Sequence, residues 1–473
     1  MRELLANDPA ANDTHMNTST TKLKTKIRNL CQQQASIDSP IYHHKSSLSR
    51  LCAIGNNIEV DLCDNTELQF FSKKYDIHNM LHTEYDANGK RTTNKALCKH
   101  GMRIFATLLY LRVIMSEVSR VTKSRKLSFI NVCYKAFEHI DKTEFTRISQ
   151  LDEILERTIN QTCEHPQTGK YNNVYSHCPD NNQKHSTLPL DILFYEGPIA
   201  RAYLETIYSI GYKPRRIIKL IPQNDIITKK PVGRFLPTSL RVRYAERIQS
   251  QKIHYWSRYF LSNHTTACQN IFRDIKKSLG IHTSAIERAN QLRPLQQYCD
   301  HITPLLISSL KDPRLSDFLN QKNKSLYLFT GGGIMPKNLF DHGANEFLHI
   351  HPGHLPEIRG ADCLLWSMIL HNQPSATCFY MAPGIDTGDI IHATYLPRIP
   401  LPKEITSLDD KMIYRFLYCY VDPWVRAAVL RDTLVKTNQF MNTTSSPQKI
   451  TQGHTFHFMQ QRLRASAIMK FIK

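Results

Sequence analysis

The sequence contains no long apolar run and no closely spaced pair of cysteines. Among its 473 residues there is no stretch of about 18 or more consecutive apolar side chains, so no membrane-crossing helix is expected. Residues 1–20, MRELLANDPAANDTHMNTST, have no apolar centre, which argues against a secretory signal. The 12 cysteines stand singly without a Cys-x-x-Cys pair, as expected for free thiols in a reducing compartment. These absences predict a cytoplasmic protein without a membrane segment.

Negative charge is also scarce. The chain has 61 Lys and Arg against 41 Asp and Glu, which gives a formal net charge of +20. Residues 201–280 alone hold 16 basic and 4 acidic side chains, and so supply more than half of the excess. This imbalance predicts an acidic partner such as RNA, a nucleotide-sugar or a polyglutamylated cofactor. The alternative is a solubilising surface without a specific partner.

The composition is that of a folded protein, and the length predicts two or three domains. The first 187 residues divide into a disordered N-terminus, a helical or mixed domain of unknown role and a polar linker, at residues 1–21, 22–162 and 163–187. Helices are expected in the second of these segments, at residues 97–121, 127–140 and 148–159. The last segment, residues 397–473, is interpreted as a helical tail, with helices at 409–436 and 454–472.

From residue 188 onward, short apolar runs alternate with helical patterns. The runs at residues 190–195 and 216–221 flank a helical pattern at 199–210, which is the order of a βαβ unit. Further strands are expected at 325–329, 347–350, 377–381 and 390–396, and a helix at 363–370. Residues 188–396 are therefore predicted to form an α/β domain with a doubly wound, mostly parallel sheet of the Rossmann type.

Three segments of this domain stand out as candidates for a site. Residues 330–336 (TGGGIMP) form a glycine-rich turn after a strand, where a backbone can approach a ligand closely. In residues 347–360 (FLHIHPGHLPEIRG), two histidines two positions apart share one face of a strand. Residues 383–391 (PGIDTGDII) place two aspartates in a loop. Each segment alone has a structural interpretation, as a turn or as packed histidines. Their occurrence together in this order favours a functional site.

This combination resembles the folate-dependent formyltransferase family, which includes methionyl-tRNA, glycinamide ribonucleotide and amino-sugar formyltransferases. The family pattern is Asn-x-His-Pro-Ser-x-Leu-Pro, followed by Arg-Gly and then by Asp-Thr-Gly. Here residues 349–356 are HIHPGHLP, residues 359–360 are RG and residues 386–388 are DTG. The resemblance covers residues 188–396 and leaves the first 187 residues uncovered. It implies transfer of a formyl group from 10-formyltetrahydrofolate to an amine.

The chemistry of formyl transfer agrees with these residue types. An amine attacks the formyl carbon, so an oxyanion develops and a proton leaves the nitrogen. Hydrogen-bond donors must face the oxyanion, and a group that titrates near neutrality suits the proton transfer. The resemblance implies that His351 stabilises the oxyanion and helps to move the proton. It further implies that Asp386 orients the ring of His351 or tunes its charge.

The sequence departs from the family at two positions of the histidine motif. His349 stands where the family has Asn, and Gly353 stands where it has Ser. A ring N–H of His349 can replace the amide donor, or a charge on His349 can shift the pKa of His351. The departure also admits a catalytically weak protein that binds a ligand or nucleic acid. Zinc held by His349, His351 and Asp386 is a further alternative, although the family needs no metal.

The resemblance also implies where the folate is bound. The pterin ring is expected between the glycine-rich turn and the loop before Asp386, because a flat heterocycle needs apolar walls and backbone hydrogen bonds. The implied residues are Gly332, Gly333, Ile334 and Met335 on one side, and Ala382, Gly384 and Ile385 on the other.

A basic insert at residues 222–300 is the candidate region for the acceptor. It opens with KKPVGR at 229–234, which faintly resembles the loop that methionyl-tRNA formyltransferases lay on their tRNA. Lys230, Arg234 and Arg359 are predicted to bind the acceptor. An acidic, nucleotide-linked amine is the preferred acceptor, and methionyl-tRNA is the alternative. The short helical tail argues against tRNA, and a solvated basic helix is the structural alternative for the insert. A zinc site in the linker, at Cys163, His165, His177 and Cys178, is only weakly indicated by the irregular spacing.

Overall fold

The computed structural model describes residues 110, 113, 122–137, 145–161, 185–320, 325–340, 345–449 and 452–472. The chain divides into two compact units, Met1–Glu156 and Arg157–Lys473. The described part of the first unit consists mainly of α5 (Lys123–Phe137) and most of α6 (Phe145–Asn160), which match the helices predicted at 127–140 and 148–159. Of the helix predicted at 97–121, only residues 110 and 113 are described, and both are helical. The predicted disordered N-terminus and most of the linker lie outside the described residues.

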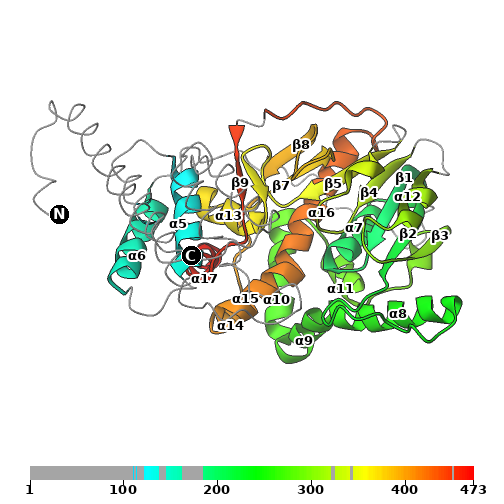
Figure 1. Cartoon of the computed structure of the whole chain (residues 1–473), viewed down its shortest axis with the longest axis horizontal. Helices are drawn as coiled ribbons and strands as arrows, with labels where there is room; N and C mark the ends of the chain where they lie inside the picture. Colours follow the sequence, from blue (N-terminus) through cyan, green and yellow to red (C-terminus); the bar gives the residue numbers. More distant parts are fainter. Residues whose placement is uncertain are drawn as a thin grey trace, which may run out of the picture. The chain divides into compact units, whose positions relative to one another are not determined.

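The second unit is built on a seven-stranded sheet in the order β3-β2-β1-β4-β5-β7-β8 (Figure 1). The strands from β3 to β5 in this order all pair in parallel. The pairs β5–β7 and β7–β8 are antiparallel. The bounds are β1 (Ser186–Tyr195), β2 (Tyr212–Pro222), β3 (Ile302–Ile307), β4 (Leu326–Phe329), β5 (Glu346–His351), β7 (Ser375–Tyr380) and β8 (Ile390–Tyr395). The predicted α/β fold with a mostly parallel sheet is confirmed.

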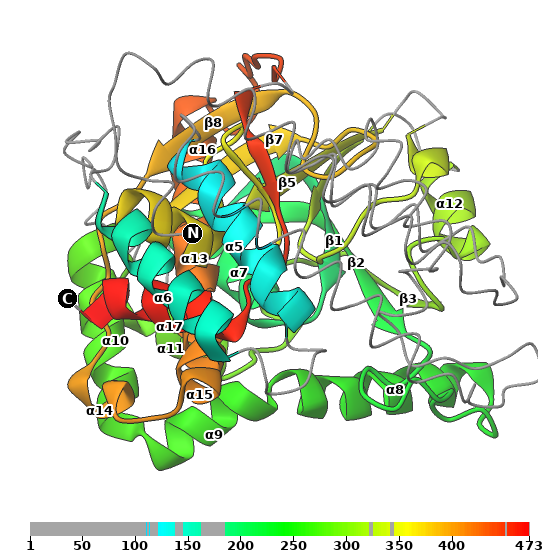
Figure 2. The ribbon, with the colours of Figure 1, turned by 60° about the vertical axis from the view of Figure 1, so that its left-hand side comes forward.

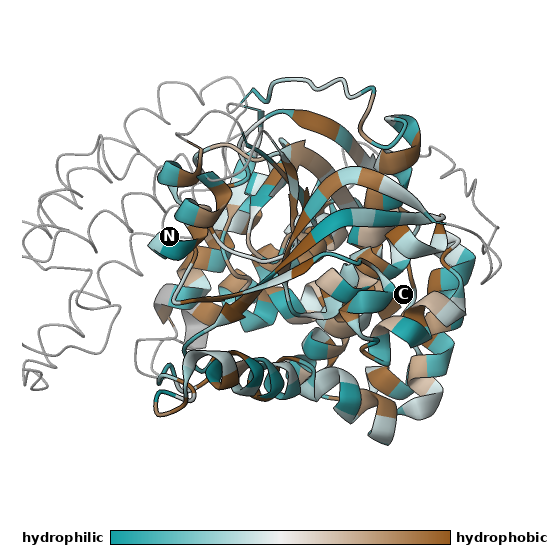
Figure 3. Ribbon diagram, turned by 90° about the vertical axis from the view of Figure 1, so that its right-hand side faces the viewer, coloured by the Kyte–Doolittle hydropathy of each residue, from teal (hydrophilic) through white to brown (hydrophobic). Residues whose placement is uncertain are grey.

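Burial explains why these segments form strands. The apolar runs of β1, β2 and β7 are buried, as in strands that lie between two layers of helices. Figure 3 shows hydrophobic (brown) stretches among the strands in the middle of the ribbon. Strand β3 was not predicted, and it contains Pro304. It lies at the edge of the sheet and pairs only with β2, where a proline that lacks an N–H is tolerated.

The predicted helices around the sheet are present. α7 (Pro198–Ser209) begins with a proline in its first turn, where the missing N–H costs no helical hydrogen bond. α13 (Cys363–His371) follows the histidine motif and is almost entirely buried. The helix predicted at 409–436 is present as α15 (Asp410–Phe416), one π-helical turn (Leu417–Val421) and α16 (Asp422–Lys436), after the short α14 (Lys403–Thr406). α16 packs against α7 and β7, so the region predicted as a tail contributes to the core.

The basic insert is helical. It contains α8 (Thr238–Ile253), α9 (Tyr255–Asn263), α10 (Thr265–Leu279) and α11 (Thr283–Asn290), and α12 (Pro313–Asn320) follows β3. Short 3-10 turns occur at Leu295–Gln297 and Lys337–Leu339. α8 runs along the lower edge of the unit in Figures 1 and 2. The sequence predicted a basic insert here but did not predict where its residues lie in the fold.

The last part of the chain differs from its prediction. β6 (Ile358–Gly360) and β9 (His454–Phe456) form a separate two-stranded parallel sheet, and the final helix is α17 (Gln461–Ile472). The helix predicted at 454–472 is therefore wrong for its first seven residues, because residues 454–456 form backbone hydrogen bonds with a distant strand instead. Among the described residues, no helix combines the length and the apolar character needed to cross a bilayer.

Candidate active site

The two histidines of the motif lie on one side of β5, an interior strand between β4 and β7. Both are buried, with 8% of His349 and 2% of His351 exposed. His351 is the last residue of β5, and the glycine-rich turn follows the neighbouring strand β4. The order of strands reverses between β1 and β4, and ligands of open α/β sheets bind at the carboxyl ends of strands beside such a reversal. The fold therefore places the motifs at the edge of the sheet where a ligand site is expected.

Both ring nitrogens of His351 face acceptors. Nε2 donates to the carbonyl oxygen of Ile358 at 2.8 Å, and Nδ1 lies 3.3 Å from Oδ1 of Asp386. Only the protonated ring donates from both nitrogens at once, so the ion pair with Asp386 forms when His351 is protonated. The structure thus brings together His351 and Asp386, which the sequence predicted as partners.

The turn after His351 has no room for a side chain at position 353. A Cβ atom on Gly353 would lie 2.6 Å from the carbonyl oxygen of Ile358 and 2.8 Å from Nε2 of His351. Both distances are below any ordinary van der Waals contact. The His351 ring therefore occupies the space that a serine at this position would need, and the departure from the family pattern at Gly353 is coupled to the orientation of His351.

Asp386 lies in a loop with an uncommon backbone conformation. Its φ is 52°, in the left-handed region, and the flanking Gly384 and Gly388 have φ values of 136° and 115°. Its Oδ2 accepts a hydrogen bond from the backbone N–H of Gly360 at 2.7 Å. Burial alone would raise the pKa of this carboxyl group. The charge and hydrogen bond of His351, together with the Gly360 N–H, outweigh burial and hold the pKa well below its usual range.

His349 has a different environment from His351. Its Nδ1 donates to the carbonyl oxygen of Phe329, at the end of β4, over 3.1 Å. Burial, and then the positive charge of Arg426, lower the pKa of His349 to about 4, although the bond to Phe329 opposes this shift. His349 is therefore neutral near pH 7. Its single N–H is used by Phe329, so Nε2 carries a lone pair.

Arg426 is a contributor that the sequence prediction missed. This buried side chain of α16 donates to the carbonyl oxygen of Ile350 at 3.1 Å, between the two histidines, and to Asp422 at 2.9 Å. It places a fixed cation directly behind β5. An Arg four residues after an Asp on a helix is a common surface pair, so the sequence carried no signal that this pair is buried.

The residues predicted to bind folate are only partly accessible. Gly332, Gly333 and Ile334 are exposed on the turn, with 61% of Ile334 accessible. Met335 is 3% exposed and belongs to the hydrophobic core beneath the turn, so its side chain is not an open wall. On the facing loop, Ala382 is half-buried, whereas Gly384 and Ile385 are exposed. Apart from Met335, these residues remain predicted folate contacts.

The residues predicted to bind the acceptor lie in two different settings. Lys230 and Arg234 are exposed in the segment that leads into α8. Arg359 is 5% exposed, and its guanidinium donates to the carbonyl oxygen of Gly453 at 3.2 Å. In this conformation Arg359 contacts the C-terminal segment, and only the two residues before α8 are open to an acceptor.

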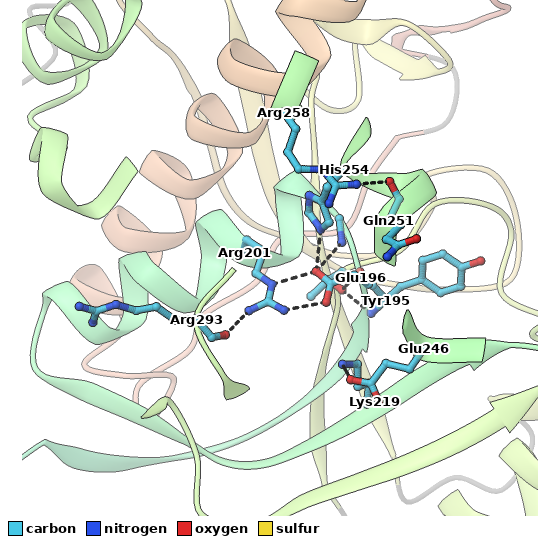
Figure 4. A network of polar contacts seen from close by, with 11 residues as sticks. Tyr195, Glu196, Arg201, Lys219, Glu246, Gln251, His254, Arg258 and Arg293 are labelled. Atoms are coloured by element: carbon cyan, nitrogen blue, oxygen red, sulfur yellow. Dashed lines mark hydrogen bonds and ion pairs between the residues drawn. The ribbon is translucent and has the colours of Figure 1, made fainter. Parts of the chain in front are cut away.

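A buried polar network fixes the turn after β1, and the sequence did not predict it (Figure 4). Glu196 accepts two hydrogen bonds from Arg201, at 2.8 and 2.7 Å, and lies 3.0 Å from Nε2 of His254. Burial alone would raise the pKa of Glu196, but the bonds from His254 and Arg201 hold it well below its usual range. His254 joins α8 to α9, so the network attaches the basic helices to the carboxyl end of β1.

Within the described ranges, no group of three or more His, Cys, Asp or Glu side chains is arranged to hold a metal ion. In the zinc alternative, the ring nitrogen of His351 that binds the metal would have to give up its present partner, Ile358 or Asp386. The four residues of the weakly indicated linker site lie outside the described residues.

These features define an α/β domain with a buried imidazole–carboxylate pair at the carboxyl end of a central strand. Sequence comparison then finds that part of the chain is similar to methionyl-tRNA formyltransferases. Methionyl-tRNA formyltransferase from Rickettsia canadensis is 29% identical over 165 residues, which are 34% of this chain and 51% of that protein. The enzyme from Rickettsia bellii is 32% identical over 167 residues, with the same two shares. The enzyme from Syntrophus aciditrophicus is 31% identical over 105 residues, or 22% of this chain and 33% of that protein.

These matches confirm the resemblance to the formyltransferase family over part of the chain. The chain spans about half, or less, of the length of these curated relatives. No protein-family model matches the chain.

Two solved structures are matched over 60% of this chain. A sugar N-formyltransferase from a Shewanella species is 12% identical and covers 60% of this chain and 87% of its own, with a TM-score of 0.31. An N-formyltransferase from Helicobacter canadensis, in complex with folinic acid and dTDP-3-aminofucose, is 13% identical and covers 60% and 81%, with a TM-score of 0.32. Similarity at this level adds nothing to the sequence match.

Proposed function

We propose that this chain transfers a formyl group from 10-formyltetrahydrofolate to an amine of an acidic, nucleotide-bearing acceptor. The observation that carries the proposal is the contact between His351 and Asp386, which joins the two halves of the family motif in one buried pair. When His351 is protonated, such a pair holds the cationic ring in place before the reaction begins. Electrostatic stabilisation of a developing oxyanion is the largest single contribution to many acyl transfers.

The two histidines have separate roles in this proposal. The protonated ring of His351, held in place by Asp386, stabilises the oxyanion that forms when the amine nitrogen attacks the formyl carbon. His349 is neutral and offers a lone pair on Nε2, because its N–H is bonded to Phe329. It accepts a hydrogen bond from the attacking amine. The sequence predicted His349 either as a donor to the oxyanion or as a charge that shifts the pKa of His351. The tautomer that Phe329 requires supports the role of an acceptor instead.

Methionyl-tRNA is the second candidate acceptor. The curated relatives act on this substrate by name, and α8 carries exposed Arg243 and Arg247 beside the exposed ring of Tyr244. Basic side chains neutralise phosphates, and aromatic rings stack on bases. The same surface also suits the pyrophosphate of a nucleotide-sugar, which one or two arginines bind.

Mass spectrometry of the acceptor tests both candidates. The full chain is incubated with 10-formyltetrahydrofolate and either dTDP-3-aminofucose or methionyl-tRNA, and the product is examined for the mass of one added formyl group. His351→Ala serves as the matched control. A gain with one acceptor, absent in the control, supports the proposal and identifies the acceptor class. No gain with either amine, although the folate binds, favours a ligand-binding protein on the same fold.

A further inference from the structure

Two stretches near the C-terminus, residues 445–449 and 452–459, contact the two loops that carry the motif residues. At the start of the first stretch, the backbones of Ser446 and Ile390 exchange two hydrogen bonds of 2.8 Å. The side-chain amide of Gln448 then donates from Nε2 to the carbonyl oxygens of Asp386 at 3.1 Å and Gly388 at 2.7 Å. One side chain of this stretch therefore holds the aspartate loop at two points.

The second stretch holds the loop after the histidine motif. His454 donates its N–H to the carbonyl of Glu357 at 3.0 Å, and Ala361 donates its N–H to the carbonyl of Phe456 at 2.9 Å. Met459 donates its N–H to the carboxylate of Asp362 at 2.8 Å. These are the bonds of β6 and β9 and their continuation. The two stretches thus hold the Asp386 loop and the loop whose Gly360 N–H binds the Asp386 carboxylate.

Glycine permits the close approach of the second stretch to this loop. A Cβ atom on Gly453 would lie 1.7 Å from the carbonyl oxygen of Pro356. A Cβ on Gly360, whose φ is +99°, would lie 2.1 Å from the carbonyl oxygen of Phe456. No rearrangement of a flexible side chain relieves such contacts, because the obstacle is backbone in each case. The second stretch and this loop therefore pack backbone against backbone.

The aspartate loop needs an external support. A non-glycine residue with positive φ is destabilised relative to ordinary backbone, and persists where its surroundings determine the conformation. Asp386 is such a residue, and Gln448 binds the carbonyl of Asp386 itself and that of Gly388 two positions later. The orientation of the amide is fixed by chemistry, since its oxygen in the same place would face two carbonyl oxygens.

We propose that Gln448 is a positioning residue, whose amide holds the Asp386–Gly388 turn so that the Asp386 carboxylate stays against His351. The inference rests on the proposed function, since it assigns a support to the same buried pair. Gln448 acts through the backbone of the loop and is not placed in contact with the reacting groups.

The test compares Gln448→Met and Gln448→Ala with Gln452→Met in the full chain. Methionine keeps the length of the side chain and adds no charge, but it has no N–H to donate. Gln452 provides a matched control, because its side chain is exposed and it lies only four residues away. The first measurement is a carboxyl ¹³C NMR titration with labelled aspartate, in which Asp386→Asn identifies the signal. The second is single-turnover formyl transfer as a function of pH, to whichever of dTDP-3-aminofucose and methionyl-tRNA gains a formyl group in the mass spectrometry test.

In both Gln448 variants, we expect the pKa of Asp386 to move toward its usual range and the single-turnover rate to fall by about 10- to 100-fold, the scale for misplacement of a catalytic group. Gln452→Met should match the wild type in both measurements. An unchanged Asp386 titration in both Gln448 variants overturns the inference, whatever their activity.

The titration also separates this inference from the proposed function. If the wild type transfers no formyl group but the Asp386 titration moves in the Gln448 variants, the positioning role stands and the proposed function fails. If the wild type is active and the titration does not move, the proposed function stands and the positioning role fails.

Discussion

Oδ1 of Asp386 lies 3.3 Å from Nδ1 of His351, although the two residues belong to separate sequence motifs on separate loops. Each partner has a second anchor on the backbone between them, Ile358 for His351 and Gly360 for Asp386. Both backbone anchors belong to β6, so this short strand fixes the distance between the two charged groups. A pair fixed in this way needs little reorganisation when charge develops nearby, which is the property that favours catalysis by electrostatic stabilisation.

Replacement of His351 should abolish most of the activity. His351→Ala removes the positive charge of the pair, and we expect turnover to fall by about two to four orders of magnitude. Steady-state kinetics and the thermal unfolding midpoint together separate a chemical loss from misfolding. His301→Ala, at an exposed histidine, is the matched control and should retain wild-type turnover. A folded His351→Ala variant with wild-type turnover would remove His351 from the mechanism.

Asp386→Asn keeps the shape of the side chain and removes its charge. We expect folate affinity to change little and the single-turnover rate to fall strongly, as when the orienting carboxylate of a triad is lost. Because the pKa of Asp386 is lowered in the folded state, its contribution to stability is present at neutral pH and disappears as pH falls through that lowered pKa. The free energy of unfolding, measured with urea, should therefore fall more on acidification in the wild type than in Asp386→Asn. Loss of folate binding with an unchanged single-turnover rate would make Asp386 a binding residue only.

The lowered pKa of His349 leads to a prediction about the pH dependence of stability, which can be tested without an activity assay. Folding lowers this pKa from 6.5 to about 4, so protons bind the unfolded chain more readily in that interval. Stability therefore falls as pH drops from about 6.5 to about 4, and His349→Asn should lack this component. Urea unfolding midpoints at several pH values measure it. Parallel pH dependences in the two proteins would mean that His349 is not buried in neutral form.

Kinetics of His349 variants test its proposed role as an acceptor. The wild-type rate should fall at acid pH, as Nε2 becomes protonated with a pKa of about 4. That component should be absent from the rate profiles of His349→Asn and His349→Ala. Equal rates for all three proteins across the pH range would place His349 outside the chemistry.

A side chain at position 353 should be costly. Gly353→Ala places a Cβ against Nε2 of His351 and the carbonyl of Ile358, and overpacking of this kind typically destabilises by about 1–3 kcal/mol. Gly332→Ala is the matched control for stability, because a Cβ there meets nothing within 4 Å. Urea unfolding compares the two variants. Similar stabilities would mean that the His351 ring and the carbonyl of Ile358 both move aside at little cost, which would contradict tight packing at Gly353.

The network at the end of β1 should be important for stability. Glu196→Gln leaves Arg201 buried without its charged partner, and removing one side of a buried pair typically costs about 3–5 kcal/mol. Glu246→Gln, at a pair with Lys219 whose glutamate is 41% exposed, should cost less, because water reaches the exposed side of this pair. Because the pKa of Glu196 is lowered by folding, its contribution is present at neutral pH and is lost on acidification. Equal losses in the two variants at pH 7 would contradict this assignment.

The sequence predicted six of the seven strands of the sheet because buried strands have a local pattern, and the family resemblance implied the pairing of the two motifs. Apolar runs such as residues 190–195 identify buried strands, and a long motif identifies His351 and Asp386. The carboxyl-end position of the site then follows from the parallel order of the strands.

The contributors that escaped prediction are all defined by contacts between distant segments. β9 has three residues and no alternating pattern, so only its pairing with β6 identifies it. The buried state of Arg426 and the role of His254 depend on which helix packs on which strand. Gln448 lies in a polar segment, and nothing in its neighbourhood along the chain indicates the two carbonyls that it binds.

The strand β9 determines when the site can be completed during protein synthesis. Arg359 and Gly453 are separated by 94 positions, and Asp362 and Met459 by 97. The ribosome must therefore release residues 453–459 before the loop after the histidine motif acquires its neighbouring strand. A nascent chain with all three motifs already outside the ribosome still lacks the bonds that hold those motifs together. Premature termination before residue 453 would leave every motif residue intact in a product without an assembled site.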